Sequence, residues 1–276
     1  MRVGPVSLRS TVPRYMRYPA LFLILTVACS ISESSPDAPS RPFHHRGDPP
    51  VITPTPTAYK TVPLPAFGRI SGSVTFAGPT PIDSVTHVTT DADVCGATLV
   101  DISIRTRGPR LAGAIVWITG VRAGKPMPYT KRFDLMTQGC RLIPRVQTAI
   151  VGGTVNVRNA DATTHRTRFV RDGVEIATVP ETEDGQTVPA ESVLTTAGLI
   201  EVDCAIHPWT HGWIATFDHP YFTMTNDDGQ FAIDSIPPGR YRITAWHERF
   251  GTISDSMTVS AGVTTAPMMT FRRARP

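Results

Sequence analysis

The sequence predicts an all-β protein built from sandwich domains. From residue 68 onward, short runs rich in β-branched and aromatic residues follow one another closely, with Gly, Pro, Asn and Asp between them. This spacing is typical of β-sandwiches. No window shows the apolar period of an amphipathic helix of ordinary length. With 276 residues, the chain is long enough for one or two such domains after a leader is removed.

Residues 1–29 have the order of a secretory signal. Four Arg precede the apolar run 20–25, and small residues stand before Cys29. The apolar run is too short to span a bilayer. The segment resembles a bacterial lipobox, which implies lipidation of Cys29; cleavage nearby is the alternative, because Thr26 stands where Leu is commoner. We expect an exported protein in the periplasm or at the outer membrane or cell surface, held to a membrane only by its lipid.

The net charge gives no reason to expect a nucleic-acid partner. Residues 1–28 contain four Arg and no acidic residue, so the remainder carries 23 basic and 23 acidic residues. The basic isoelectric point of the whole chain therefore reflects the leader, and we expect no nucleic-acid surface. Residues 30–65 follow with nine prolines among Ser, Thr and Asp. We interpret them as a semi-rigid, disordered linker.

The stretch 200–213 contains the main chemical signal. Ile200, Val202 and Cys204 alternate with acidic residues, so Cys204 is expected to point into a core at the end of a strand. His207 follows in the next turn. A Cys-x-x-His pair can chelate one ion, but a firm site needs further ligands. Exported proteins meet an oxidising compartment, and pairing of Cys204 with Cys95 or Cys140 remains an alternative because sequence does not determine connectivity.

Three segments resemble the carboxypeptidase regulatory-like (transthyretin-like) domain. They are 68–74, 112–118 and 225–243, and they include an Asp228-Gly229 turn, expected to close a hairpin, and a Pro237-Pro238-Gly239 turn. Together they span too much sequence for one such domain, so we expect an insertion. The prediction is a transthyretin-like sandwich of residues 66–125 plus 221–276, interrupted by a domain of residues 126–220.

The insertion resembles cupredoxins of the plastocyanin and amicyanin type. Residues 152–165 are similar to their first ligand strand and loop, and Cys204-x-x-His207-Pro208 is similar to the short ligand loop of amicyanin. The resemblance implies a Greek-key sandwich and one type-1-like copper held by His165, Cys204 and His207. It also implies that Pro208, Trp209 and Trp213 surround a solvent-facing edge of His207, where electrons enter.

Three positions depart from the cupredoxin pattern. Thr210 stands where an axial Met is expected, which predicts a nearly three-coordinate site with a raised potential. His211 is an additional candidate ligand, and a third imidazole would favour Cu(II) or zinc. Arg166 follows His165 where Asn is common, which removes a brace of the ligand loop.

The remaining cysteines resemble those of exported multidomain cupredoxin-like proteins. That resemblance implies a structural disulfide between Cys95 and Cys140 that clasps the two domains. If Cys29 is lipidated, Cys204 is then left as a metal ligand. The stretches 219–222 and 246–248 are interpreted as a junction between the domains, with a second polar cluster as the alternative.

The first functional hypothesis is a non-enzymatic copper protein that transfers one electron or holds copper, with a redox partner protein or a copper donor as its partner. The alternative is a metal-free binding or scaffold module that contacts glycan or protein through the transthyretin-like sandwich. In that case Cys204 is an inert thiol or a half-cystine, and His165 and His207 fill polar positions of a sandwich. An enzyme with an open His₃-type metal site is a third and more distant hypothesis.

Overall fold

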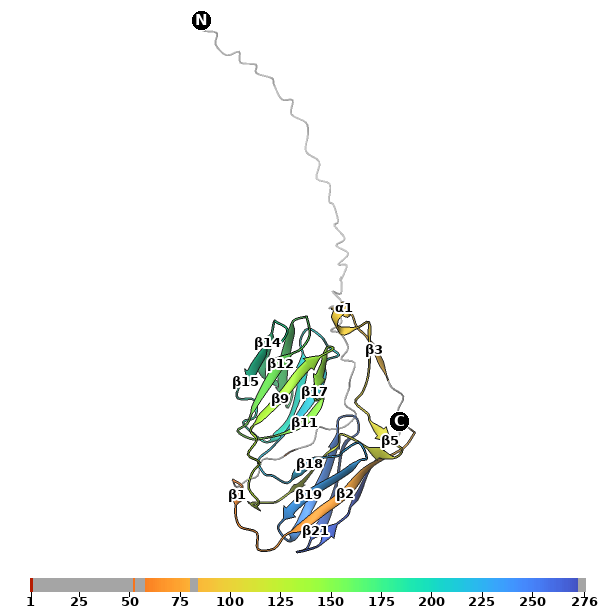
Figure 1. Cartoon of the computed structure of the whole chain (residues 1–276), viewed down its shortest axis with the longest axis vertical. Coiled ribbons are helices and arrows are strands. Elements are labelled where there is room, and N and C mark those ends of the chain that lie inside the picture. The colour runs from red at the N-terminus through yellow and green to blue at the C-terminus, as the bar shows by residue number, and fades with distance from the viewer. Residues whose placement is uncertain (2–51, 53–57, 80–83, 273–276) are drawn as a thin grey trace, which may run out of the picture. The chain divides into compact units, whose positions relative to one another are not determined.

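The computed structural model describes residues 1, 52, 58–79 and 84–272, and the structural statements below concern these residues. Their regular secondary structure is almost entirely β-strand, as Figure 1 shows, which confirms the all-β prediction. The described helix, α1 (Ala92–Cys95), is one turn long, and no described helix could cross a membrane. Cys29, the rest of the predicted leader after residue 1 and most of the predicted linker lie outside the described residues.

Two sheets form what we call the inserted lobe, residues 132–217. The first sheet has, in spatial order, β10 (Arg141–Ile143), β9 (Arg132–Gln138), β12 (Thr154–Asn159) and β15 (Thr187–Ala190). The second has β11 (Val146–Ile150), β17 (His211–Phe217), β16 (Gly198–Cys204), β13 (His165–Arg171) and β14 (Val174–Glu181).

Alternate residues of β12 and of the first part of β13 are buried, because successive side chains of a strand point to opposite faces. Val155 and Val157 of the first sheet share the core of the lobe with Phe169 of the second. His165 and Thr167 lie on the same inward face of β13 as Phe169, and both are fully buried. The first half of β13 therefore brings polar side chains into one end of an apolar core.

The segments before and after the insertion form a second pair of sheets, which we call the flanking lobe. One sheet has β18 (Phe222–Met224), β7 (Ile115–Thr119), β20 (Gly239–His247) and β21 (Gly251–Val259). The other has β19 (Gln230–Ile236), β2 (Gly68–Ala77), β6 (Arg110–Leu111) and β5 (Thr106–Arg107), and β22 (Thr264–Thr265) and β23 (Met268–Arg272) also pair with β2. The apolar core of the flanking lobe lies between these two sheets and includes Ile70, Phe231 and Ile243.

The predicted Asp228-Gly229 turn of the flanking lobe joins two strands that do not pair with each other. Gly229 adopts a φ of 66°, which suits glycine in a tight turn. The turn does not close a hairpin, because β18 pairs with β7 and β19 pairs with β2. The chain therefore passes from one sheet to the other at this turn, so the hairpin prediction is wrong.

The two lobes share an apolar junction and a partly buried ion pair. Strand β17 is buried along its whole length: Ile214 belongs to the core of the inserted lobe, while Trp213 packs on Trp246 of the flanking lobe with ring centroids 5.5 Å apart. Beside them the Arg145 guanidinium bonds both carboxylate oxygens of Glu248, at 2.9 and 3.0 Å. The lobes accordingly belong to one compact unit.

The end of the predicted linker is attached to this unit. Ile52 is buried in the junction cluster, and the short strand β1 (Lys60–Thr61) pairs in parallel with β8 (Ala123–Gly124). The Tyr59 hydroxyl donates to the carbonyl of Lys125 at 2.5 Å. These contacts hold residues that the proline content alone assigned to a disordered tether.

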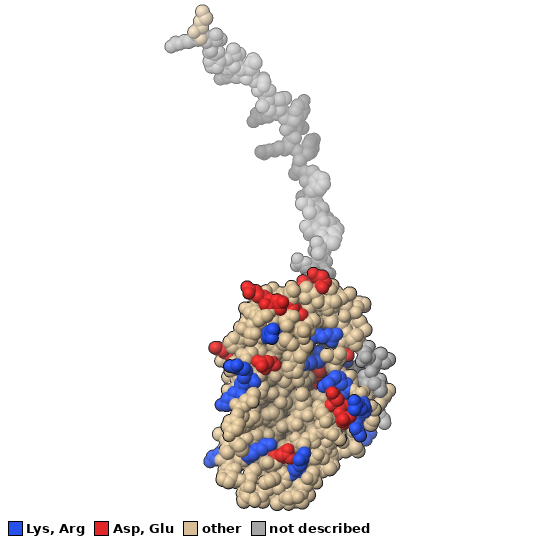
Figure 2. All heavy atoms as spheres, viewed as in Figure 1, with Lys and Arg blue, Asp and Glu red and all other residues tan. Residues whose placement is uncertain are grey.

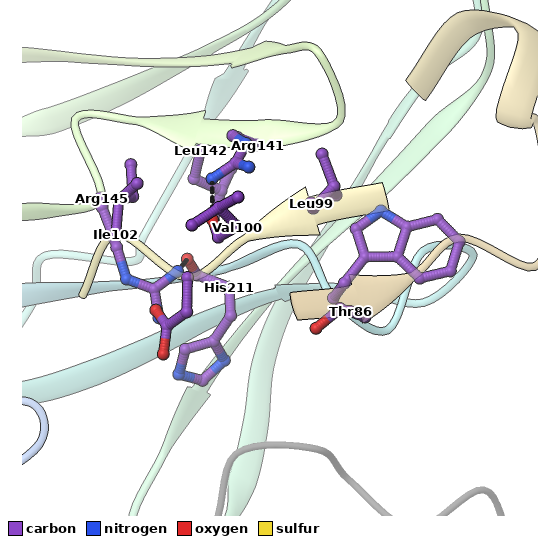
Figure 3. Close-up of a pocket in the computed structure, with 10 residues that line it drawn as sticks. Thr86, Leu99, Val100, Ile102, Arg141, Leu142, Arg145 and His211 are labelled. Carbon is purple, nitrogen blue, oxygen red and sulfur yellow. Dashed lines mark hydrogen bonds between the residues drawn. The ribbon is translucent and has the colours of Figure 1, made fainter. Parts of the chain in front are cut away.

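A segment of the predicted flanking domain lies instead against the inserted lobe (Figure 1). We call residues 84–102 the strap; it contains β3 (Val85–His87), α1 and β4 (Thr98–Val100), and β3 pairs with β4. Trp209 packs with Val88 and Leu99 of the strap. The guanidinium of Arg141 donates to the carbonyl of Val100 at 2.8 Å, as Figure 3 shows. The strap covers the end of the inserted lobe at which the ligand loop lies.

Candidate metal centre

Neighbouring strands position two of the three predicted ligands. His165 is the first residue of β13 and Cys204 is the last residue of β16. These strands pair antiparallel with Thr167 opposite Cys204, so the start of one meets the end of the other. Cys204 is 3% exposed and points inward, as its alternation with acidic neighbours predicted. His207 comes from the turn that follows β16 and precedes β17.

The structure brings the three donor atoms together. The Cys204 Sγ lies 3.8 Å from the Nδ1 of His165 and 3.7 Å from the Nδ1 of His207, and the two Nδ1 atoms are 3.1 Å apart. Bonds from a metal are about 2.0 Å to imidazole nitrogen and about 2.3 Å to thiolate sulfur. Each separation is shorter than the sum of the corresponding bond lengths, so one ion can reach all three atoms.

Each of the two imidazoles has a carboxylate partner at its other nitrogen. The Nε2 of His165 lies 3.0 Å from the Oδ2 of Asp161, and the Nε2 of His207 lies 2.9 Å from the Oδ2 of Asp91. An ionised carboxylate only accepts hydrogen bonds, so Nε2 of each ring is the protonated nitrogen. Both Nδ1 lone pairs then point toward each other and toward the cysteine sulfur. A metal cation is bound by several lone-pair donors directed at one point, and these three buried atoms provide that arrangement.

The charges of the centre also favour a thiolate. Burial by itself raises the pKa of Cys204, but interactions with His165 and His207 and the amide of Arg166 outweigh it and lower the pKa to about 5. That amide donates to the sulfur at 3.4 Å. Although burial lowers the pKa of His207, its bonds to Cys204 and Asp91 raise the pKa above the usual value. Because the thiolate is the form that binds metal, Cys204 is ready for it at neutral pH.

Glu181 adds a second buried carboxyl group on the His165 side. It lies opposite His165 in the β13–β14 pair and its side chain is fully buried. Burial raises the pKa of Glu181 to about 7, and its interactions with the Thr167 hydroxyl and amide only partly offset that effect. The loop and strand around His165 therefore carry two acidic groups, of which Asp161 contacts the ligand.

The two additional candidate ligands point elsewhere. The Thr210 hydroxyl donates to the carbonyl of Cys140 at 2.6 Å, and the Nδ1 of His211 lies 3.6 Å from a carboxylate oxygen of Glu201. His211 lies beside a small cavity under the strap, next to Arg145 (Figure 3). Within the described residues, His211 does not join His165, Cys204 and His207 in a group of converging donors.

The expected solvent-facing edge of His207 is not there. His207 is 0% exposed, because Asp91 of the strap occupies the position beside its Nε2. Trp209 is 6% exposed and packs on the disulfide, and Trp213 is buried in the junction between the lobes. Of the predicted apolar surface, only Pro208 is exposed. The prediction of an exposed edge is wrong because the sequence did not reveal that a distant segment covers this loop.

Cys95 and Cys140 form a disulfide, with Cα atoms 5.2 Å apart, and Cys204 is the free cysteine of the described residues. The bond joins the strap to the inserted lobe, so the part of the chain that it clasps is α1 and not the flanking sandwich. Its sulfur atoms lie within 4.8 Å of a ring nitrogen of His207. The disulfide therefore fastens the strap directly beside the ligand loop.

Asp91 and Asp161 are the site residues that sequence reasoning missed. Asp161 could have been found, because it stands four residues before His165 in the loop that resembles a ligand loop. Asp91 had no sequence signal, since it is 116 residues away from His207. Its backbone is in the left-handed region, with φ 55° and ψ 37°. Such a conformation costs a residue other than glycine about 1–3 kcal/mol and is found where the surroundings require it.

Comparison with known proteins gives one match to a family model and several to solved structures. The model described as polysaccharide lyase family 4, domain II matches residues 195–267, which run from the end of the inserted lobe into the flanking lobe. No curated protein matches the sequence.

Similar solved structures include cupredoxins. A purple cupredoxin from Nitrosopumilus maritimus has 19% sequence identity, covers 31% of this chain and 99% of its own, and has a TM-score of 0.27. A Cu(I) variant of amicyanin has 18% identity, covers 37% of this chain and 98% of its own, and has a TM-score of 0.28. The copper-containing nitrite reductase of Thermus scotoductus SA-01 has 23% identity, covers 36% of this chain and 24% of its own, and has a TM-score of 0.28.

Proposed function

We propose that this chain binds one copper ion through His165, Cys204 and His207 and holds it. The observation that carries the proposal is the convergence of two Nδ1 atoms and one sulfur atom within 3.1 to 3.8 Å of one another, with both Nε2 atoms engaged by carboxylates. Bound copper would supply a one-electron redox couple and a strong bond to sulfur. The protein would contribute a dry, prearranged set of one thiolate and two imidazoles.

Copper fits this donor set better than zinc. Structural zinc sites use four ligands in a tetrahedron, whereas a His₂Cys set with a weak or absent axial ligand is the type-1 copper arrangement. Thr210 would be the nearest fourth donor by sequence, but its hydroxyl donates to a carbonyl. The described residues thus offer three strong donors, and the thiolate among them suits both copper oxidation states.

Holding copper is better supported than rapid electron exchange with a partner protein. The His207 edge through which a partner would pass an electron is covered by Asp91, and His207 itself is fully buried. A copper donor is therefore the partner that we propose. The leader signal and Cys29 support an exported, lipid-anchored location.

Copper loading tests the proposal. Purified protein given Cu(II) is expected to develop an intense visible absorption from the copper–thiolate bond together with narrow copper hyperfine splitting. Cys204→Ala should lose both signals completely. His211→Ala is the matched control, because it removes a neighbouring imidazole that does not face the donors. A colourless wild-type protein with the spectrum of ordinary Cu(II) would contradict the proposal.

A second candidate function is favoured by the family model. Its match to a domain of polysaccharide lyases over residues 195–267 is consistent with a module that binds polysaccharide. In that case retention of the protein on immobilised polysaccharides should be equal for wild type and Cys204→Ala. The absence of retention on a panel of acidic and neutral polysaccharides would remove this candidate.

A further inference from the structure

We infer that Asp91 is a positioning residue of the copper centre, and that its carboxylate orients His207 and biases the centre toward the divalent ion. The inference rests on the proposed copper site. It adds to that site a residue outside the ligand strands and a preference between copper oxidation states.

The carboxylate of Asp91 fixes the orientation of the His207 ring. The Oδ2 of Asp91 lies 2.9 Å from the Nε2 of His207, a ring with no solvent exposure. The same oxygen accepts a hydrogen bond from the hydroxyl of Thr163 at 2.8 Å. With Nε2–H directed at this oxygen, the ring cannot turn, and its Nδ1 stays directed at Cys204 and His165. A hydrogen bond from a ligand imidazole to a carboxylate also makes that imidazole a stronger donor to the metal.

Asp91 bonds His207 instead of capping the helix α1 that follows it. Asp91 occupies the N-cap position of α1, where an aspartate ordinarily accepts a hydrogen bond from an amide of the first helical turn. Here the side chain makes no capping bond, and it turns to His207 and Thr163 instead. Four residues later Cys95 ties the strap to Cys140, which prevents the carboxylate from withdrawing.

The negative charge of Asp91 favours Cu(II) over Cu(I) at the proposed site. Coulomb attraction scales with the product of the charges, so the Asp91 carboxylate attracts Cu(II) about twice as strongly as Cu(I) at the same distance. Asp161 acts in the same direction from the other imidazole. Asp91 therefore opposes the rise in potential expected from the absence of an axial methionine.

The test compares two aspartates of one segment. Asp91→Asn removes the charge and retains a residue that tolerates the left-handed backbone. Asp93→Asn makes the same change at an exposed position of α1. We expect the Asp91 variant to bind Cu(II) about tenfold more weakly, within the range for partners of metal ligands, and Cu(I) about threefold more weakly, because the carboxylate attracts the monovalent ion about half as strongly. The resulting change of about threefold in the ratio raises the one-electron potential by about 30 mV, since a tenfold change corresponds to about 59 mV. Asp93→Asn should leave the ratio unchanged.

Each outcome decides the inference. If Asp91→Asn weakens both oxidation states equally, or neither, the residue is merely structural and the inference fails while the copper site stands. If wild-type protein binds no copper, the proposed function fails first.

Should Asp91→Asn not fold, the wild-type protein loaded with Cu(I) supplies the second measurement. The Nε2–H of His207 is expected as a slowly exchanging imidazole proton in ¹⁵N-resolved NMR, and an unprotonated or rapidly exchanging Nε2 would overturn the inference.

Discussion

The two imidazoles of the centre are held by the same chemical device, built in two different ways. On the His165 side the carboxylate is local: Asp161 is four residues away, only 5% of its side chain is exposed, and it also accepts the amides of Gly139 and Cys140 at 2.6 and 3.0 Å. On the His207 side the carboxylate is distant: Asp91 is 116 residues away and 35% of its side chain is exposed.

Because of this difference, the geometry of one imidazole can be lost while that of the other is kept. The loop around Asp161 is also closed by the Asn159 side chain, which donates to the Thr163 carbonyl at 2.8 Å and accepts the Asp161 amide at 2.9 Å. The His165 side should therefore keep its geometry without the strap. The His207 side depends on the strap, on its disulfide and on the packing of Trp209.

Removing the disulfide, which fastens the strap on the His207 side, is expected to have the largest effect. The pair of substitutions Cys95→Ser and Cys140→Ser opens a closed loop of 45 residues, for which the loop-entropy relation gives about 4 kcal/mol of lost unfolding free energy. Urea unfolding measures this loss. A variant as stable as wild type would show that packing alone holds the strap and would weaken the contrast between the two sides.

Asp161→Ala should damage the His165 side through three lost hydrogen bonds. At about 1 kcal/mol for each bond, the free energy of unfolding falls by about 3 kcal/mol, and copper affinity falls about 10- to 100-fold. Urea unfolding and copper titration measure the two losses. The matched control is Asp184→Ala, at an exposed turn of the same lobe. Equal losses in both variants would mean that Asp161 has no special role.

Glu181→Gln tests the second acidic group of the His165 side by its pH dependence. The folded-state pKa of about 7 lies above the ordinary 4.5, so the folded protein binds more protons than the unfolded chain between these values. The unfolding free energy of the metal-free wild type minus that of Glu181→Gln should therefore fall by about 2–3 kcal/mol as the pH rises from 4.5 to 7. The lowered pKa of Cys204 acts in the opposite direction, but it does so in both proteins, so the difference reports Glu181. Glu183→Gln, which is exposed, should show the pH dependence of the wild type. Parallel wild-type and Glu181→Gln curves would refute the assignment.

Thr210→Val is expected to have the smallest effect and shows whether the ligand loop has an axial donor. The substitution removes the hydrogen bond to the Cys140 carbonyl, at about 1 kcal/mol of unfolding free energy. Because the hydroxyl is occupied by that carbonyl, the copper absorption spectrum should be unchanged. A shift in the visible band would place the hydroxyl at the metal after all.

Sequence patterns predicted the strands well and the long-range contacts poorly. The alternation around Cys204 gave its inward direction, and the spacing of turns gave the all-β class, because both depend on neighbours along the chain. The predicted disordered linker includes Ile52 and β1, which are in fact part of the folded unit. Nothing in the local sequence distinguishes them from the prolines around them. The exposed edge of His207 was wrong because its cover comes from the strap.

Short segments of the sequence predicted the sandwich architecture, the free thiol and the three candidate donors, because strand period and ligand chemistry are local properties. The convergence of the donors and the closure of the centre by Asp91 are visible only in the folded chain, as is the Cys95–Cys140 disulfide that fastens this closure. Most of these contacts join residues tens to more than one hundred positions apart. Their energy depends on the packing of the strap against the inserted lobe, which no local pattern encodes.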